Sequence, residues 1–119
     1  MLTFSRAMKI YFSLQPADMR KSFDGLSAMV QMVLDADPLS GHLFVFINKR
    51  ADRMKAIYWD GDGYAVWCKR LEQGTFRMPM LRRGKHDVRI EMTSAELSML
   101  LEGIEVKNVR RRTRYSLPK

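Results

Sequence analysis

LFVFI at residues 43–47, followed by AIYW at 56–59, DGDG at 60–63 and YAVWC at 64–68, decides the fold of this 119-residue chain. An Asp-Gly pair between two runs of aromatic and β-branched residues is the strongest short-range signal for a β-hairpin. The run at residues 43–47 is apolar on both faces, which predicts a central strand of a sheet. The sequence therefore predicts an antiparallel meander with a tight turn at Asp60 to Gly63.

The turn can centre on residues 61–62 or on residues 62–63. In both cases the numbers of two residues that face each other across the hairpin sum to an odd value, so the side chains are divided between the same two faces. Cys68 is then expected among large apolar groups, where a free cysteine acts as a small hydrophobe. Tyr58 and Trp67 beside Lys69 are expected either to stack on bases or a protein partner or to be covered by a helix. The first face holds Ile57, Trp59, Tyr64, Val66 and Cys68, and the second holds Ala56, Tyr58, Ala65, Trp67 and Lys69.

Two segments show the periodicity and the end signals of α-helices. The second segment opens with the capping box at residues 93–96 and closes at Gly103. The first begins after Ser22, which suits an N-cap, and it ends before Pro38. Its apolar stripe consists of Phe23, Leu26, Val30, Val33 and Leu34.

Two further strands are expected at residues 8–12 and 86–92, and residues 49–53 form the loop before the hairpin. These elements predict an α+β domain, in which an antiparallel β-meander with a central hairpin is packed by two helices, mainly on one face. We assign residues 1–106 to this single domain and residues 107–119 to a basic, flexible C-terminal tail.

Composition limits the class of protein. A chain of this length suffices for one domain that buries roughly two-thirds of the surface exposed by its unfolded chain. Cys68 is the only cysteine and the two histidines stand apart, so we expect no disulfide, no zinc site and no cofactor. No apolar run exceeds five residues, and Arg6 and Lys9 interrupt the N-terminus. We therefore expect neither a signal peptide nor a spanning helix, and a cytoplasmic location.

Positive charge is concentrated at the C-terminus. The formal net charge is +8, and residues 107–119 carry six positive groups and no acidic residue, which leaves +2 on residues 1–106. A near-neutral domain with a basic tail indicates a polyanionic partner such as nucleic acid. The alternative is a tail that is merely solvated, as many basic runs are.

Several separated motifs point to one family. They are DMRKSFDGL at 18–26, DPLSGHLFVF at 37–46, YWDGDG at 58–63, KRLE at 69–72 with Gly74, Phe76 and Pro79, and LLEGI at 100–104. In this order they closely resemble the TnpB-type (second open reading frame) accessory proteins of the IS66 family of bacterial insertion sequences. The resemblance covers about residues 8 to 105.

The resemblance implies a protein that is encoded beside a separate transposase and is needed with it for movement of the element. It carries over no catalytic residues. Ser22 stands where the family often has glycine, and Met78 stands where a tryptophan commonly precedes the proline. Residues 80–89 and the tail after Glu105 follow the family pattern loosely, so no partner contacts are transferred to them.

An enzymatic activity of its own is not expected. A phosphoryl-transferring nuclease needs acidic groups that converge on divalent metals, whereas the acidic residues here match turn and cap positions. Asp60 and Asp62 belong to the hairpin turn, and Asp24 lies in the first turn of a helix. The chain also lacks a Gly-rich phosphate loop and a Ser/His/Asp set. A degenerate nuclease subunit is therefore a weaker interpretation than the two that follow, a DNA-binding accessory protein and a protein-interaction adaptor.

We therefore expect a non-catalytic accessory protein for DNA transposition that binds DNA through its phosphates and assists a transposase. The alternative is an adaptor that docks the transposase or a sister accessory protein without direct DNA binding. The expected contact surface is the face of Tyr58, Trp67, Lys69 and Met54, or an apolar patch on the leucine helix near Leu97. A homodimer through an exposed sheet edge is compatible with both. The expected phosphate contacts are Lys49, Arg50, Arg53, Arg82, Arg83, Lys85, Lys107, Arg110, Arg111, Arg112 and Arg114.

Overall fold

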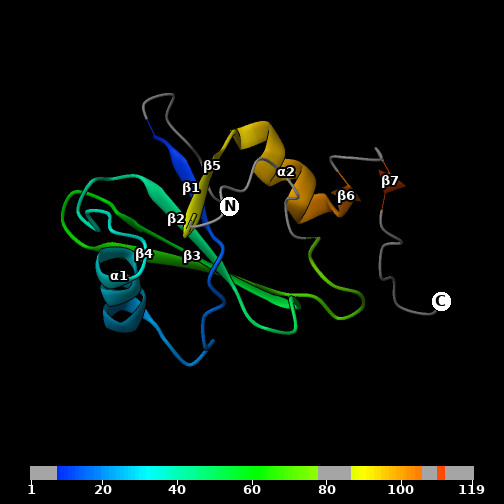
Figure 1. The fold of residues 1–119 in the computed structure, drawn as a ribbon, viewed down its shortest axis with the longest axis horizontal. Helices are drawn as coiled ribbons and strands as arrows, with labels where there is room; N and C mark the ends of the chain where they lie inside the picture. Colours follow the sequence, from blue (N-terminus) through cyan, green and yellow to red (C-terminus); the bar gives the residue numbers. More distant parts are fainter. Residues whose placement is uncertain (1–7, 78–86, 106–109, 112–119) are drawn as a thin grey trace.

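The computed structural model describes residues 8–77, 87–105 and 110–111, and it confirms the α+β class (Figure 1). A five-stranded sheet carries two α-helices, and a two-stranded sheet follows near the C-terminus. The elements are β1 (Ile10–Ser13), α1 (Phe23–Met32), β2 (Leu43–Ile47), β3 (Arg53–Trp59), β4 (Tyr64–Arg70), β5 (Arg89–Met92), α2 (Ser94–Glu102), β6 (Ile104–Glu105) and β7 (Arg110–Arg111).

The strand order in the main sheet is β4-β3-β2-β1-β5. Strands β2, β3 and β4 form the predicted antiparallel meander. Strand β1 pairs with β2 in parallel and with β5 in antiparallel orientation, which the prediction did not include. A parallel connection needs a crossover of a dozen or more residues, usually a helix, and α1 supplies it between β1 and β2.

The turn between β3 and β4 occupies Asp60 to Gly63, as predicted. The amide of Asp60 donates to the carbonyl of Gly63 at 2.8 Å, and Gly61 has a φ of +84°, which glycine adopts without steric cost. Since Ile57 faces Val66, facing residue numbers sum to an odd value and the two predicted faces of the hairpin are confirmed.

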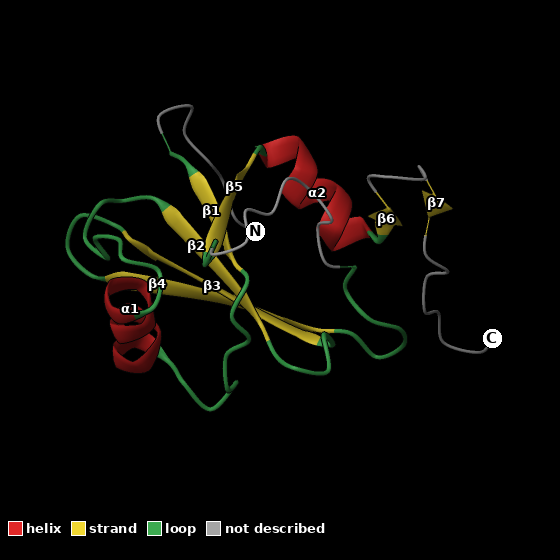
Figure 2. Cartoon of the chain, viewed as in Figure 1, coloured by secondary structure: helices red, strands yellow, loops and turns green. Residues whose placement is uncertain are grey.

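The two helices cover opposite faces of the sheet, so the expectation that they pack mainly on one face is wrong (Figure 2). The reason lies in β2, whose five residues are all buried. Because side chains alternate between the faces of a strand, a strand that is apolar throughout needs cover on both sides.

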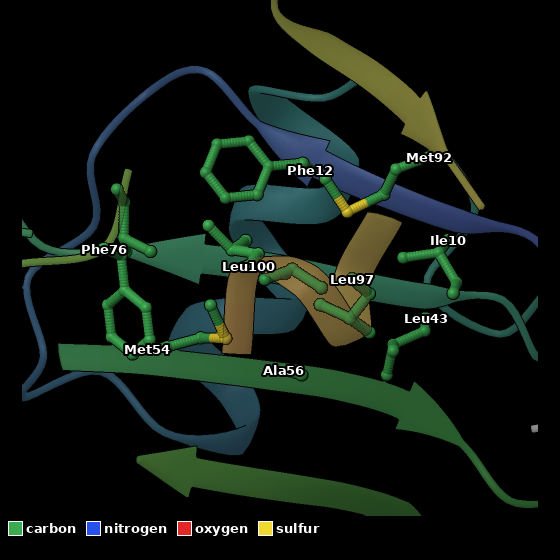
Figure 3. Packing of buried hydrophobic residues seen from close by; sticks show 11 residues of the cluster. Ile10, Phe12, Leu43, Met54, Ala56, Phe76, Met92, Leu97 and Leu100 are labelled. Carbon is green, nitrogen blue, oxygen red and sulfur yellow. The ribbon is translucent and has the colours of Figure 1, made fainter. Parts of the chain in front are cut away.

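Each face has its own core. Under α1, Leu26 and Val30 pack with Phe44 of β2 in one cluster of buried side chains. Under α2, Leu97 and Leu100 lie among side chains from β1, β2, β3 and β5, as Figure 3 shows. Full burial of one such side chain stabilises the fold by about 1.5–3 kcal/mol.

Helix α1 ends at Met32, two residues before the end of the predicted stripe. Ser22 occupies the N-cap position, but its side chain makes no capping hydrogen bond. Leu26 and Leu34 are buried as expected, whereas Phe23 is 48% exposed. Periodicity gives the angle of a side chain about the helix axis, and it does not tell whether the sheet reaches under the first turn.

Helix α2 has both predicted end signals. Thr93 Oγ1 accepts from the amide of Glu96 at 3.1 Å, and Glu96 Oε1 accepts from the amide of Thr93 at 2.9 Å. Gly103 ends the helix in the left-handed conformation with a φ of +80°. The capping box and the glycine C-cap are therefore confirmed.

Some predictions on the strands need correction. Strand β1 is Ile10–Ser13 instead of residues 8–12, and β5 begins at Arg89, while His86 lies outside the described residues. Cys68, expected among large apolar groups, is exposed. It lies on the edge strand β4, where the cluster under α1 includes Val66 but does not extend to Cys68. Across the described ranges, no helix is long and apolar enough to span a lipid bilayer.

Candidate nucleic-acid interface

The turn that joins β2 to β3 is held by the side chain of Asn48. Its Oδ1 accepts from the amides of Asp52 and Arg53, both at 3.0 Å, and its Nδ2 donates to Oδ1 of Asp52 at 2.7 Å. The backbone of Asn48 closes the turn as well, because its carbonyl accepts from the amide of Ala51 at 3.0 Å. Asparagine suits this position because its short side chain reaches nearby backbone groups.

The segment after β4 fixes the same turn from outside. The amide of Phe76 donates to the carbonyl of Ala51 at 2.6 Å, and the amide of Leu71 donates to the carbonyl of Asp52 at 2.8 Å. Ala51 has a φ of +57°, a left-handed conformation that costs a non-glycine residue about 1–3 kcal/mol. These contacts hold Lys49 and Arg50 at the tip of a well-defined turn.

A groove of about 640 Å³ lies between this turn and residues 15–20. The predicted loop residues Lys49, Arg50 and Arg53 all line it. Two further arginines join them, Arg20 from the segment before α1 and Arg70 from the end of β4. The structure thus brings five cationic side chains from three separate parts of the sequence to one surface.

The groove also contains two acidic side chains, Asp18 and Asp52, so its net charge is +3. Arg20 donates from Nε and from its terminal nitrogen to Oδ2 of Asp18, at 3.0 and 2.7 Å. These hydrogen bonds lower the pKa of the Asp18 carboxyl to about 2. Within the described residues, Lys49 and Arg50 form no ion pair.

A second hollow of about 410 Å³ adjoins the groove and shares Met19, Arg53 and Arg70 with it. It is also lined by Lys55, Lys69 and Glu72, but the Nζ of Lys69 donates to the carbonyl of Leu101 on the other face of the hairpin. Lys55 therefore extends the positive surface along β3, and Glu72 adds one negative charge beside it.

Eight of the eleven predicted phosphate contacts are not assigned to this groove. Arg110 and Arg111 form β7, and the structure describes the pairing of their backbone with β6. The other six lie outside the described residues: Arg82, Arg83, Lys85, Lys107, Arg112 and Arg114.

Sequence reasoning missed Arg20 and Arg70. Both occur in motifs that carry the family resemblance, DMRKSFDGL and KRLE, and this was the signal available in the sequence. Arg70 reaches the groove because β4 pairs with β3 in a register that places it opposite Arg53. That register is a property of the sheet and cannot be read from the charge pattern of either segment.

Tyr58, Trp67 and Lys69 share one face of the hairpin, as predicted. Tyr58 and Trp67 are half-buried and pack against the core cluster under α2. The Nζ of Lys69 donates to the carbonyl of Leu101 in α2 at 3.1 Å, where the helix dipole favours a cation. This packing favours the interpretation that a helix covers the three residues, and a partner contact through them stays a prediction. Met54 and Leu97 are buried in the same cluster, so the expected apolar contact surface at these two residues is wrong.

Acidic residues of the described segments show local turn chemistry. Asp37 Oδ1, for example, accepts from the amide of Leu39 at 2.9 Å, as the position before Pro38 suggests. Residues 8–77, 87–105 and 110–111 contain no group of three or more His, Cys, Asp and Glu side chains placed to hold a metal ion.

Comparison with known protein families adds a further observation. Residues 8–111 match the family described as IS66 Orf2 like protein. The chain belongs to this family. The matched region of this IS66 Orf2-like protein runs from β1 through β7. It therefore includes the whole groove and extends past residue 105, where the resemblance noted in the sequence ends.

Two proteins of Sinorhizobium fredii are similar to this IS66 Orf2-like protein. Uncharacterized protein y4jC is 40% identical over 108 residues, which are 91% of this chain and 89% of the relative. Uncharacterized protein y4hO is 36% identical over 105 residues, 88% of each chain. No solved structure matches the chain.

Family membership confirms the resemblance noted in the sequence. IS66 Orf2-like proteins are accessory proteins of transposition rather than catalytic enzymes, and this role applies to the present chain.

Proposed function

We propose that this IS66 Orf2-like protein binds DNA through phosphate contacts and assists a separate transposase of the same element. One observation carries the proposal: residues 15–20, the β2–β3 turn and the end of β4 gather five cationic side chains around one groove. A concave surface with a net positive charge, here +3, attracts a polyanion and raises its local concentration.

Arg53 and Arg70 supply the most specific electrostatic argument. They lie directly opposite each other in the register of β3 and β4, and like charges so placed destabilise a sheet. Oε1 of Glu72 lies 2.9 Å from a terminal nitrogen of Arg70 and balances its charge, whereas Arg53 has no acidic partner within the described residues. A phosphate between the two arginines would offset this repulsion, and the planar guanidinium group matches phosphate oxygens.

The groove favours the DNA backbone over the bases. None of the described residues that line it is aromatic, so stacking on bases, which is worth about 1–3 kcal/mol per base, is not offered there. Phosphate contacts carry little sequence information. We therefore propose binding that depends weakly on sequence, to which the arginines of β7 and the predicted basic residues outside the described ranges contribute.

A salt titration on duplex DNA tests this function. If about five cations of the groove and the basic tail together neutralise phosphates, log affinity falls against log salt with a slope near −4.5. Arg50→Gln should reduce the magnitude of the slope by about 0.9, whereas Lys9→Gln, at an exposed lysine that does not line the groove, should leave it unchanged. No binding at low salt, or a flat salt response, contradicts the proposal.

The tail offers an independent test on the same assay. Truncation after Glu105 removes the positive groups of residues 107–119 and should lower the affinity for all DNA sequences alike, because these contacts are to phosphates. A loss confined to one sequence would argue for direct reading of bases.

A pull-down with the transposase separates DNA binding from the adaptor function. Association that disappears after nuclease treatment is expected if both proteins meet on DNA. Association that survives the treatment would favour the adaptor, with Tyr58, Trp67 and Lys69 as the first residues to substitute.

A further inference from the structure

The amides of the β2–β3 turn divide into two groups. Those of Asn48, Ala51, Asp52 and Arg53 all donate to acceptors within the turn, two to its backbone carbonyls and two to Oδ1 of Asn48. The amides of the two tip residues, 49 and 50, have no acceptor among the residues that the structure describes. The two unpaired donors therefore belong to the two residues of the turn that carry unpaired positive side chains.

The surroundings suit an anion. Lys49 and Arg50 line the groove together with Arg53, and the acidic group closest in sequence, Asp52, already accepts from Asn48 Nδ2 at 2.7 Å. The tip is also held in place by its internal bonds and by the segment after β4. Because the donors are fixed before the ligand arrives, little conformational entropy is lost on binding.

We propose that the tip of the β2–β3 turn seats one phosphodiester group of a DNA strand, which accepts from the amides of Lys49 and Arg50 while their side chains offset its charge. The inference rests on the proposed DNA binding and names the atoms that perform it. Backbone amides are common donors to DNA phosphates, and they fix the register of a protein on the duplex. Asn48 is then a positioning residue, since it orients the amides without contacting the phosphate.

Amide chemical shifts test the inference directly. With the full ¹⁵N-labelled chain and a short duplex of arbitrary sequence, the largest ¹H and ¹⁵N changes are expected at Lys49 and Arg50. The amides of Gly61 and Asp62, at the tip of the exposed β3–β4 turn, are the internal control because that turn is acidic. If DNA binds while Lys49 and Arg50 change no more than Gly61 and Asp62, the inference is wrong and the proposed function stands. If no DNA binds, both are wrong.

Two variants separate the amides from the side-chain charges. Lys49→Gln with Arg50→Gln keeps both amides and should reduce the magnitude of the salt slope by about 1.8. Asn48→Ala keeps both charges, so we expect about tenfold weaker binding with the slope nearly unchanged, together with smaller shift changes at residues 49 and 50. A folded Asn48→Ala variant that binds DNA with unchanged affinity and unchanged shifts would overturn the inference. Should that variant fail to fold, the shift comparison in the native chain still decides.

Discussion

If the groove binds DNA as proposed, Asp18→Asn should strengthen the binding, because the Asp18 carboxylate already neutralises the charge of Arg20 there. Its carboxylate pairs with Arg20 through two donors, so Arg20 is a cation whose charge is already balanced. The asparagine side chain is nearly the same size and retains an oxygen that can accept from the amide of Arg20, which Asp18 Oδ1 now does at 2.9 Å. The local turn is therefore preserved while the net charge of the groove rises from +3 to +4.

The magnitude follows from counterion release. One additional free cation at the phosphates should steepen the dependence of log affinity on log salt by about 0.9. If the variant and the native protein bind DNA equally at 1 M salt, the variant should therefore bind about eightfold tighter at 0.1 M salt. Hydrogen bonds from Arg20 lower the pKa of Asp18 to about 2, so the native carboxylate stays ionised and the difference between the two proteins should be constant from pH 5 to 8.

The same pKa predicts an acid limit for the pair. The folded value of about 2 lies below the ordinary value of 3.8, so the pair stabilises the fold above pH 3.8 and this contribution is lost as the pH falls towards 2. Asp18→Asn removes that contribution and should therefore flatten the acid limb of the unfolding curve. Both carboxylate and guanidinium are exposed, so the effect on stability is small compared with the effect on DNA binding.

Fluorescence anisotropy with a labelled duplex measures the affinities, and Asp62→Asn is the matched control. Asp62 is also an exposed carboxylate, but it lies in the turn at the far end of β3 from the groove. A seven-residue strand, about 20 Å long, separates that turn from Arg53 in the groove. Both variants raise the net charge of the protein by one, so equal effects would indicate a response to total charge alone. An Asp18→Asn variant that binds no tighter than the native protein would refute the assignment of the groove.

Three further predictions concern the scaffold. Phe44→Ala should cost about 3–5 kcal/mol of unfolding free energy in a denaturant titration, whereas Phe23→Ala, at a half-exposed position, should cost much less. Thr93→Ala removes an observed capping box and should cost about 1 kcal/mol by the same measurement. Gly25→Ala should fail to raise the melting temperature despite the better helix propensity of alanine, because the new Cβ would lie 3.0 Å from Cβ and Cγ of Lys21; a clear rise would show that Lys21 yields at no cost.

Sequence reasoning succeeded where a structure is determined by its own residues. The hairpin turn at Asp60 to Gly63, the strand at residues 43–47 and the capping box at residues 93–96 are all present, since turn chemistry, apolar runs and caps act over a few residues. The α+β class followed from these elements in sequence order.

The arrangement of the helices was harder, because it depends on which strand enters the middle of the sheet. Strand β1 joins β2 in parallel, so α1 must cross over one face while α2 follows β5 onto the other. Periodicity in a helix shows that one side is apolar, but it does not show which face of a sheet receives it. The buried pattern of residues 43–47 did contain this information, since a strand that is apolar on both sides requires two covers.

The groove shows how the scaffold and the site depend on each other. On the α1 face of β3 and β4, the pair Ile57 and Val66 is apolar and lies in the cluster that contains Leu26 of α1. Four residues before Ile57, at the start of β3, the same face presents Arg53 opposite Arg70. The cationic pair therefore begins where the helix no longer covers the sheet.

The short length of α1 thus leaves the proposed binding surface uncovered. The Nζ of Lys55, which lies between the apolar pair and the cationic pair, donates to the carbonyl of Lys21 just before the helix at 2.8 Å, and this contact marks the boundary between core and groove. An α1 extended by one turn at its N-terminus would include residues 19–22, and Arg20, which now lines the groove, would become part of the helix. A register slip of one residue in the hairpin would turn Arg53 and Arg70 to opposite faces. The positive surface consequently depends on strand pairing and helix length as much as on the number of arginines in the chain.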